Sequence, residues 1–369
     1  MKKQPWIASA PVDLGFILGP AFVVTALVLL LRGPLGEIDG TPPWLWLLLV
    51  VGVDVSHVYS TVFRTYFDRE ELKKRQMLYT LVPLGAFIGG AVLYSFGALV
   101  FWRVLAYLAV FHFVRQQYGF MMIYARGERD RPMWTRRIDQ AAIYMATIFP
   151  LCWWHANHRT FNWFVEGDFV RIDWPLLGWA AGFVFAVLVL AYIAKEAFFF
   201  AKERALNAPK HLMLLGTALS WGVGIVVFNS DIAFTATNVI AHGVPYMALV
   251  WVFGRNQRAM EKKPYVAGFI DKVFDWKMLP LFIAFLFALA WVEEGLWDGL
   301  VWREHSDFFG FFRALPPVGT EDILMWLVPL LALPQVVHYV LDAFIWKHDL
   351  KDSEWKKILF YQVSTTKAS

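Results

Sequence analysis

The sequence predicts an all-α integral membrane protein, a polytopic bundle of about ten transmembrane helices with both termini in the cytoplasm. Hydrophobic residues make up 58% of the chain and charged residues only 17%, whereas soluble domains carry roughly 25% charged residues. Several apolar runs exceed the roughly 18 residues that indicate a membrane-spanning helix. The 19 tryptophans agree with this class, because aromatic rings favour the two membrane interfaces.

The candidate spans follow one another along residues 1–369, which we interpret as a single integral membrane domain. Each is close to the roughly 20 residues that a helix needs to cross a bilayer. The predicted spans are 13–32, 43–67, 77–96, 98–125, 138–154, 174–198, 209–228, 231–254, 277–296 and 322–346. The segment 298–320 mixes aromatic and charged residues, so we expect a short amphipathic helix on the outer membrane surface.

Basic residues predict the orientation of the chain. They gather after the even-numbered spans and in the tail; the loop after the sixth span, for example, holds Lys195, Lys202, Arg204 and Lys210. By the positive-inside rule, both termini are then cytoplasmic. We expect a multi-pass protein of the plasma membrane, namely the inner membrane of a bacterium. No soluble region combines a basic cluster with aromatic residues, so no nucleic-acid partner is expected.

Four of the predicted spans carry polar side chains on one helical face. Ionisable groups within a bilayer are costly, and they normally face the protein interior or a cavity. Steps of three or four residues place each set on one stripe. The stripes comprise Asp54, His57 and Thr61; His112, Arg115 and Gln116; Asp231, Thr235, Asn238, His242 and Tyr246; and Gln335, His338 and Asp342.

Each stripe contains one mid-span histidine: His57, His112, His242 or His338. All four spans are even-numbered, and counting residues from their outer ends puts the histidines in a layer roughly 8 Å thick. Imidazole suits iron, zinc, copper and nickel. The single cysteine, Cys152, excludes a thiolate cluster and an intrachain disulfide. We therefore predict one metal site with four histidine ligands, and at this point iron, zinc, copper and nickel all stay open.

The remaining stripe residues are candidates for supporting roles. Metal-bound histidines usually donate their second N–H to a carboxylate or carbonyl group. Asp54 and Asp342 lie one turn from His57 and His338, where they would orient the rings or bind the ion directly. The neutral candidates for the same task are Gln116, Asn238 and Gln335, and those for lining a catalytic cavity are Tyr246 and Arg115.

A less specific interpretation applies to each residue alone. A single histidine in a membrane helix is more often a hydrogen-bond partner between helices than a metal ligand. The polar stripes would equally suit a water-filled path. We interpret Glu293 and Glu294 as an outer-surface pair, and His155 and His158 as residues of a solvated outer loop.

Four short segments resemble a known family. PQVVHYVLD (334–342), SHVYSTVF (56–63), FHFVRQQYGF (111–120) and AHGVPYM (241–247) are similar to the histidine-bearing helices of the Brp/Blh-type carotenoid dioxygenases, membrane enzymes that cleave β-carotene to retinal. The resemblance implies a non-haem iron held by four histidines. It also implies dioxygen as co-substrate and a hydrophobic polyene or lipid that enters from the bilayer.

The leading hypothesis is an iron-dependent membrane oxygenase acting on a lipid-soluble substrate. Desaturase and metal-dependent lipid hydrolase chemistry stay open. An ion- or proton-coupled transporter would use the same histidines and aspartates as relay groups. A non-catalytic assembly subunit, in which the polar stripes only join helices, is the third alternative. The chain has no serine nucleophile elbow, phosphate-binding loop or dinucleotide fingerprint.

Overall fold

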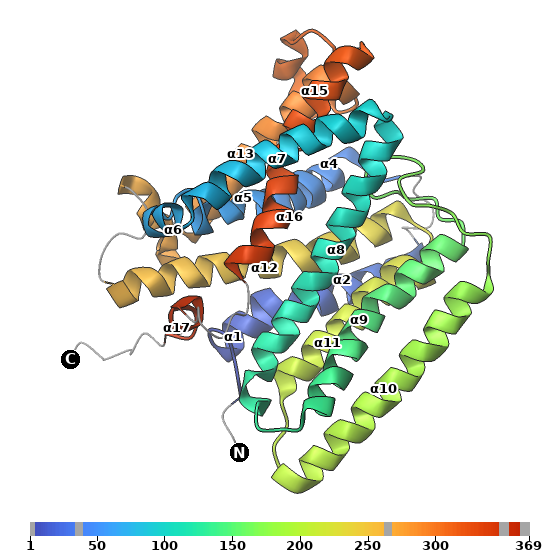
Figure 1. The fold of residues 1–369 in the computed structure, drawn as a ribbon, viewed down its shortest axis with the longest axis vertical. Helices are drawn as coiled ribbons and strands as arrows, with labels where there is room; N and C mark the ends of the chain where they lie inside the picture. The colour runs from blue at the N-terminus through green and yellow to red at the C-terminus, as the bar shows by residue number, and fades with distance from the viewer. Residues whose placement is uncertain (1–3, 34–39, 262–267, 347–353, 362–369) are drawn as a thin grey trace. The chain divides into compact units, whose positions relative to one another are not determined.

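The computed structural model describes residues 4–33, 40–261, 268–346 and 354–361. Every regular element in these ranges is helical, which confirms the all-α prediction (Figure 1). The chain divides into two compact units, Met1–Pro42 with Ala106–Pro245 and Pro43–Leu105 with Tyr246–Ser369. Below, these are unit 1 and unit 2, and each is described by itself. The single membrane domain stays a prediction.

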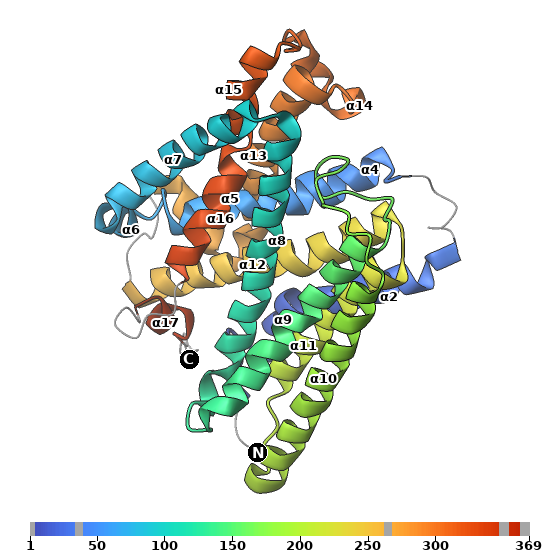
Figure 2. The ribbon, with the colours of Figure 1, turned by 45° about the vertical axis from the view of Figure 1, so that its right-hand side comes forward.

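Unit 1 contains the helices that carry His112 and His242. Its elements are α1 (Ala10–Val12), η1 (Asp13–Leu18), α2 (Gly19–Leu30), most of α8 (Ala98–Tyr124), η4 (Ala125–Glu128), α9 (Met133–Ala156), α10 (Leu176–Glu203), α11 (Ala208–Trp221), η5 (Gly222–Val227) and the first part of α12 (Asp231–Glu261). Helices α9, α10 and α11 lie side by side in both ribbon views (Figures 1 and 2).

Unit 2 contains the helices that carry His57 and His338. Its elements are α4 (Pro43–Trp46), η2 (Leu47–Val55), α5 (Ser56–Ser60), η3 (Thr61–Arg64), α6 (Arg69–Lys74), α7 (Gln76–Ser95), the start of α8, the end of α12, η6 (Gly268–Phe274), η7 (Trp276–Met278), α13 (Leu279–Trp297), η8 (Asp298–Trp302), α14 (Ser306–Phe309), η9 (Gly310–Ala314), α15 (Glu321–Leu331), α16 (Leu333–Ile345) and α17 (Glu354–Leu359). Helix α7 packs against α15 and α16, and α13 packs against η2 and α5.

Helices suited to crossing a membrane are plentiful. Among the described residues, eight helices are long and apolar enough to cross a membrane: Ala10–Leu30, Pro43–Arg64, Gln76–Ser95, Ala98–Glu128, Leu176–Glu203, Ala208–Val227, Asp231–Met260 and Trp276–Trp302. A ninth candidate joins α15 and α16 across a bend of 42°. This supports an integral membrane protein. The fifth predicted span falls on α9, a more polar helix outside this set. The count of ten stays a prediction, as does the cytoplasmic location of the termini, whose last residues lie outside the described ranges.

The helices around His57 and His338 are irregular for identifiable reasons. The bend between α15 and α16 lies between Pro329 and Pro334, and proline breaks the helical hydrogen-bond pattern. Ahead of His57, the chain is π-helical over η2 and returns to α-helix at Ser56. Wide helical turns of this kind are rare, and they are frequent at functional sites.

The segment predicted as one amphipathic helix, 298–320, forms three short helical elements instead: η8, α14 and η9. Asp298 is the first residue of η8. Its side chain accepts hydrogen bonds of 2.7 Å from the backbone N–H groups of Glu304 and His305, which follow the end of η8. Phe309 and Phe312 are buried in a cluster with Val51 and Ala290. The sequence pattern did not predict these turns, because they depend on the packing of the aromatic residues against η2 and α13 within unit 2. Their place at the outer membrane surface stays a prediction.

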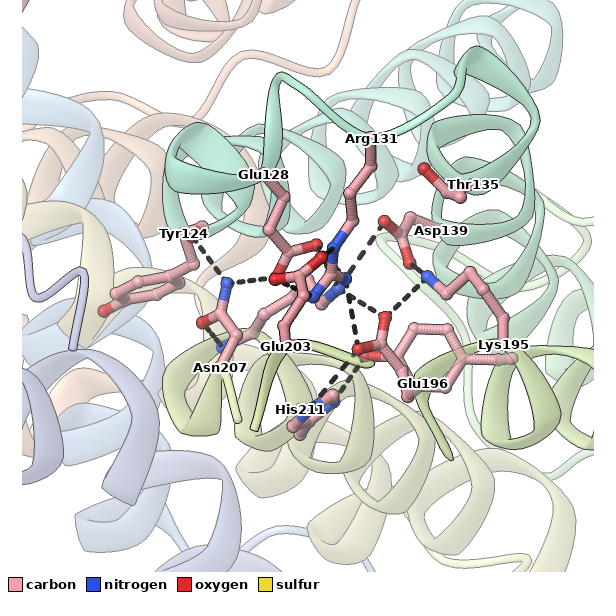
Figure 3. Close-up of polar contacts among 12 residues, drawn as sticks. Tyr124, Glu128, Arg131, Thr135, Asp139, Lys195, Glu196, Glu203, Asn207 and His211 are labelled. Carbon is pink, nitrogen blue, oxygen red and sulfur yellow. Dashed lines mark hydrogen bonds and ion pairs between the residues drawn. The ribbon is translucent and has the colours of Figure 1, made fainter. Parts of the chain in front are cut away.

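An ion-pair network joins the ends of the four helices α8 to α11 in unit 1 (Figure 3). Lys210 Nζ lies 2.6 Å from Glu128 Oε2, 2.5 Å from Glu196 Oε1 and 3.7 Å from Asp139 Oδ2. Lys195 donates to Asp139 and lies 2.7 Å from Glu196. Both lysines are buried. The sequence analysis had placed them in a basic loop, and their acidic partners account for their burial.

Arg131 extends the network to Glu203, at 3.1 Å, and to Glu128, at 2.9 Å. Burial would lower the pKa of this guanidinium, but Glu203, Glu128 and Glu196 together raise the pKa above its usual value. The Glu128, Asp139 and Glu196 carboxylates lie close enough to hold a metal ion, yet the cationic groups of Lys195, Lys210 and Arg131 already neutralise them. We interpret the network as a clamp on the helix ends.

We expect Lys210→Met to destabilise the protein strongly, because it leaves buried carboxylates without their cation. Removing one partner of a buried ion pair costs about 3–5 kcal/mol. Thermal unfolding of the detergent-purified protein measures the effect. Lys202→Met, at an exposed position of α10, is the matched control. Equal unfolding temperatures for the two variants would contradict the clamp.

Candidate metal centre

In unit 1, the two histidines form an edge-to-face pair. His112 on α8 and His242 on α12 are both buried, and their ring centroids lie 5.1 Å apart at an interplanar angle of 79°. Phe113 fixes the orientation of the second ring, since it stacks on His242 with centroids 3.5 Å apart and planes 7° from parallel. Phe113 belongs to an aromatic cluster with Trp154, Phe161 and Phe234, so the surroundings of this pair are apolar.

The polar residues around His112 each have a local partner. Gln116 donates from Nε2 to the backbone carbonyl of His242, at 2.9 Å, and thereby ties α8 to α12. Gln117 accepts a hydrogen bond of 3.0 Å from Thr217 on α11. Gln116 was predicted as a partner of a histidine ring, but it holds the peptide group of His242 instead.

Unit 2 contains a second pair with nearly the same geometry. The ring centroids of His57 and His338 lie 4.9 Å apart at an interplanar angle of 78°, and both residues are buried. The Tyr246 ring lies edge-on to both histidines, 6.0 Å from His57 and 5.1 Å from His338. Asp54 Oδ1 is 3.6 Å from His57 Nδ1. It is thus placed beside this ring, as predicted, but beyond hydrogen-bond distance.

A chain of hydroxyl groups sets the orientation of His338. The hydroxyl of Thr61 lies 2.6 Å from His338 Nδ1 and 2.8 Å from the Tyr246 hydroxyl, which donates to Asp342. The Thr61 hydroxyl therefore engages Nδ1 of His338. Because Nδ1 is engaged in this way, Nε2 is the atom with which His338 would bind an ion.

Asp342 and Tyr246 lie close to His338. Asp342 Oδ1 lies 3.7 Å from Nδ1 of His338, so this aspartate is beside the ring as Asp54 is beside His57, and it also reaches the ring through Tyr246 and Thr61. The Tyr246 hydroxyl is engaged by Thr61 and Asp342, and the catalytic role predicted for Tyr246 stays a prediction.

The four histidines form a buried cluster that could hold a metal ion. Each histidine offers one ring nitrogen, and these four nitrogens lie within 4.8 Å of one another. Four nitrogens bound tetrahedrally to one ion at about 2.1 Å lie about 3.4 Å apart. Reaching that separation takes a shift of less than about 1 Å per ring, and a histidine-only donor set suits an ion such as iron or zinc.

Arg115 lies apart from the histidine cluster, and its predicted role in lining a catalytic cavity stays a prediction. Its side chain lies on the exposed face of α8, donates to the Tyr144 hydroxyl at 2.6 Å and covers the Tyr118 ring. A step of three residues turns a helix by about 300°, which places Arg115 about 60° away from His112. The guanidinium is therefore held by tyrosines on the outer side of the helix.

Two of the neutral candidates have less defined roles. Asn238 is buried and donates to the carbonyl of Phe234 on its own helix, while its Oδ1 has no hydrogen-bond partner among the described residues. This acceptor lies one turn before His242. Gln335 is partly buried, three residues before His338. The predicted contacts of both residues with histidine rings stay predictions.

Sequence reasoning did not assign the roles of Thr61 and Phe113. Thr61 was on the predicted polar stripe, four residues after His57, but its contact is with a histidine of another helix. For Phe113, the sequence indicates no role beyond its place next to His112.

Comparison with protein-family models finds no match for this chain, and neither do comparisons with curated proteins and solved structures.

Proposed function

We propose that His57, His112, His242 and His338 together bind one metal ion, iron in the first instance and zinc as the alternative. We further propose that the protein is a membrane oxygenase acting on a lipid-soluble polyene or lipid. The observation that carries the proposal is the buried cluster of four histidines. Bound iron would supply the chemistry of dioxygen activation, and the protein would supply the ligands and an apolar environment.

The geometry of the two pairs supports a metal more than simple helix joining. A histidine that only joins helices needs one hydrogen-bond partner on a neighbouring helix. Here each ring lies beside a second buried imidazole at close to a right angle. His338 also has a hydrogen-bond partner at its second ring nitrogen, as metal-bound histidines normally have, and Asp54 lies beside the corresponding nitrogen of His57.

The surroundings support a lipid-soluble substrate. Phe113 and the aromatic cluster around Trp154 and Phe234 line the neighbourhood of His242, and apolar walls exclude water from a site where reactive species form. Substrate binding at the histidines does not require Arg115, which Tyr144 holds on the outer face of α8.

Metal content tests whether the four histidines act together. The detergent-purified protein should contain one equivalent of metal by elemental analysis. The double variants His57→Ala/His338→Ala and His112→Ala/His242→Ala should each lose it, because each removes half of the ligands. His158→Ala, at an exposed position, should keep it. Circular dichroism confirms that each variant is folded.

Two other results would contradict a shared site. Retention of half of the metal by each double variant would indicate two independent ions. A folded wild-type protein that binds no metal would favour the transporter or the assembly subunit.

Dioxygen uptake tests the oxygenase proposal itself. The iron-loaded protein should consume dioxygen when a long polyene such as β-carotene is supplied in mixed micelles, with formation of oxidised product. The zinc-loaded protein is the control, because zinc has no redox chemistry. Equal uptake by both forms, or none with any polyene or unsaturated lipid, would leave a metal site without oxygenase activity.

We expect Thr61→Val to weaken metal binding by about 10- to 100-fold, the usual cost of losing a hydrogen bond that orients a metal ligand. Valine keeps the shape of threonine but cannot bond to His338 or Tyr246. Thr61→Ser keeps the hydroxyl and should bind nearly as well as the wild type. Competition with a chelator of known affinity measures the change. Unchanged affinity in Thr61→Val would remove Thr61 from its positioning role.

A further inference from the structure

Glu293 is the most unusual acidic residue of unit 2. It lies on α13, inside the apolar span Trp276–Trp302, and only 4% of its surface is exposed. Tyr59 and Trp297 approach its carboxyl group, but in the described part of the chain no hydrogen bond of good geometry reaches either oxygen. The sequence analysis interpreted Glu293 as part of an outer-surface pair, and its burial shows that this was wrong.

Other acidic residues accompany it. Glu294 interacts electrostatically with Glu293, Asp54 and Asp298, and Glu293 interacts with Asp54. Among the described residues, the charged groups that act on Glu293 and Glu294 are all acidic. Asp298, one turn further along the helix, lies 4.0 Å from Arg313 and binds two backbone N–H groups, so it is already satisfied.

A buried carboxyl group that no well-formed hydrogen bond reaches calls for an explanation. Leaving such a group unsatisfied costs roughly 1–3 kcal/mol, and more when it is charged. An ion that the site binds only part of the time is one accepted reason for such a group. Glu293, Glu294 and Asp54 repel one another when ionised, and a divalent cation relieves that repulsion.

The position of these carboxylates relates them to the histidines. Helix α13 packs against η2 and α5, which carry Asp54 and His57. Asp54 Oδ1 lies 3.6 Å from His57 Nδ1, so the acidic residues lead to one of the proposed ligands. Within the described chain, they do not gather as tightly as the four histidines do. Spaced carboxylates suit brief, successive contacts more than permanent binding.

We propose that Glu293, with Glu294 and Asp54, forms an entry route along which a divalent metal cation reaches His57. This rests on the proposed metal centre and adds the means of loading it. Carboxylate oxygens bind the partly hydrated ion first, and imidazole nitrogens then replace them. Acidic groups along a low-dielectric path attract a cation and raise its rate of arrival by about 10- to 1,000-fold.

The test measures the rate of metal uptake separately from its extent. Full-length protein in detergent is stripped with a chelator and mixed with Co²⁺, whose visible absorption reports binding to nitrogen ligands. Glu293→Gln should slow uptake by about tenfold or more and reach the same final absorbance as the wild type. Glu293→Asp, which keeps the carboxylate, should load much faster than Glu293→Gln. Glu321→Gln, at an exposed position of α15, is the control and should load like the wild type.

Each other outcome has a definite meaning. Wild-type uptake rates in Glu293→Gln would overturn the entry route and leave the metal centre intact. A lower final absorbance in Glu293→Gln, without slower uptake, would make Glu293 a ligand or a structural residue, which also overturns the route. No uptake by the wild type would overturn the proposed metal centre itself.

Discussion

Burial of imidazole among apolar helices is the constraint on which the rest of this structure depends. A buried polar ring needs a partner, because each unsatisfied polar group costs roughly 1–3 kcal/mol. The His57–His338 and His112–His242 pairs meet that need in the same way, as nearly perpendicular rings about 5 Å apart. One ring nitrogen of each histidine lies within 4.8 Å of those of the other three. A metal ion can bind several such nitrogens at once, which a single hydrogen bond does not.

The residues around the two pairs hold the rings by different means. In unit 2, a run of hydrogen bonds from Asp342 through Tyr246 and Thr61 reaches Nδ1 of His338. In unit 1, ring stacking by Phe113 holds His242, and Gln116 holds its peptide group. A hydrogen bond engages one particular ring nitrogen, whereas stacking sets only the plane of the ring. The nitrogen of His338 that faces an ion is therefore better defined than that of His242.

The sequence predicted two kinds of feature: those that follow from hydrophobic periodicity, and those that follow from the free-energy cost of burying polar groups in a membrane. Apolar runs indicated the helices, and the rarity of mid-span histidines singled out the four that form the cluster. Contacts between distant segments were beyond its reach. Thr61 contacts a histidine 277 positions later in the chain, and no local pattern encodes that. The surroundings of Arg115 and Glu293 could not be predicted from the sequence, because a pattern along one helix does not say which other helices pack against it. Arg115 contacts Tyr144, and the helix that carries Glu293 packs against α5 and η2.

The contrast between the two buried acidic groups shows how charge is used in this chain. Glu128, Asp139 and Glu196 are matched by two buried lysines and an arginine, so their negative charge is already neutralised within the protein. In the described part of the chain, the charged groups that act on Glu293 and Glu294 are acidic. A fixed ammonium group makes the helix ends rigid, because moving it would leave several carboxylates unpaired. Carboxylates without a fixed cation are stabilised when they bind a cation from solution. The same residue type thus serves as a clamp in one unit and as a means of attracting a metal cation in the other.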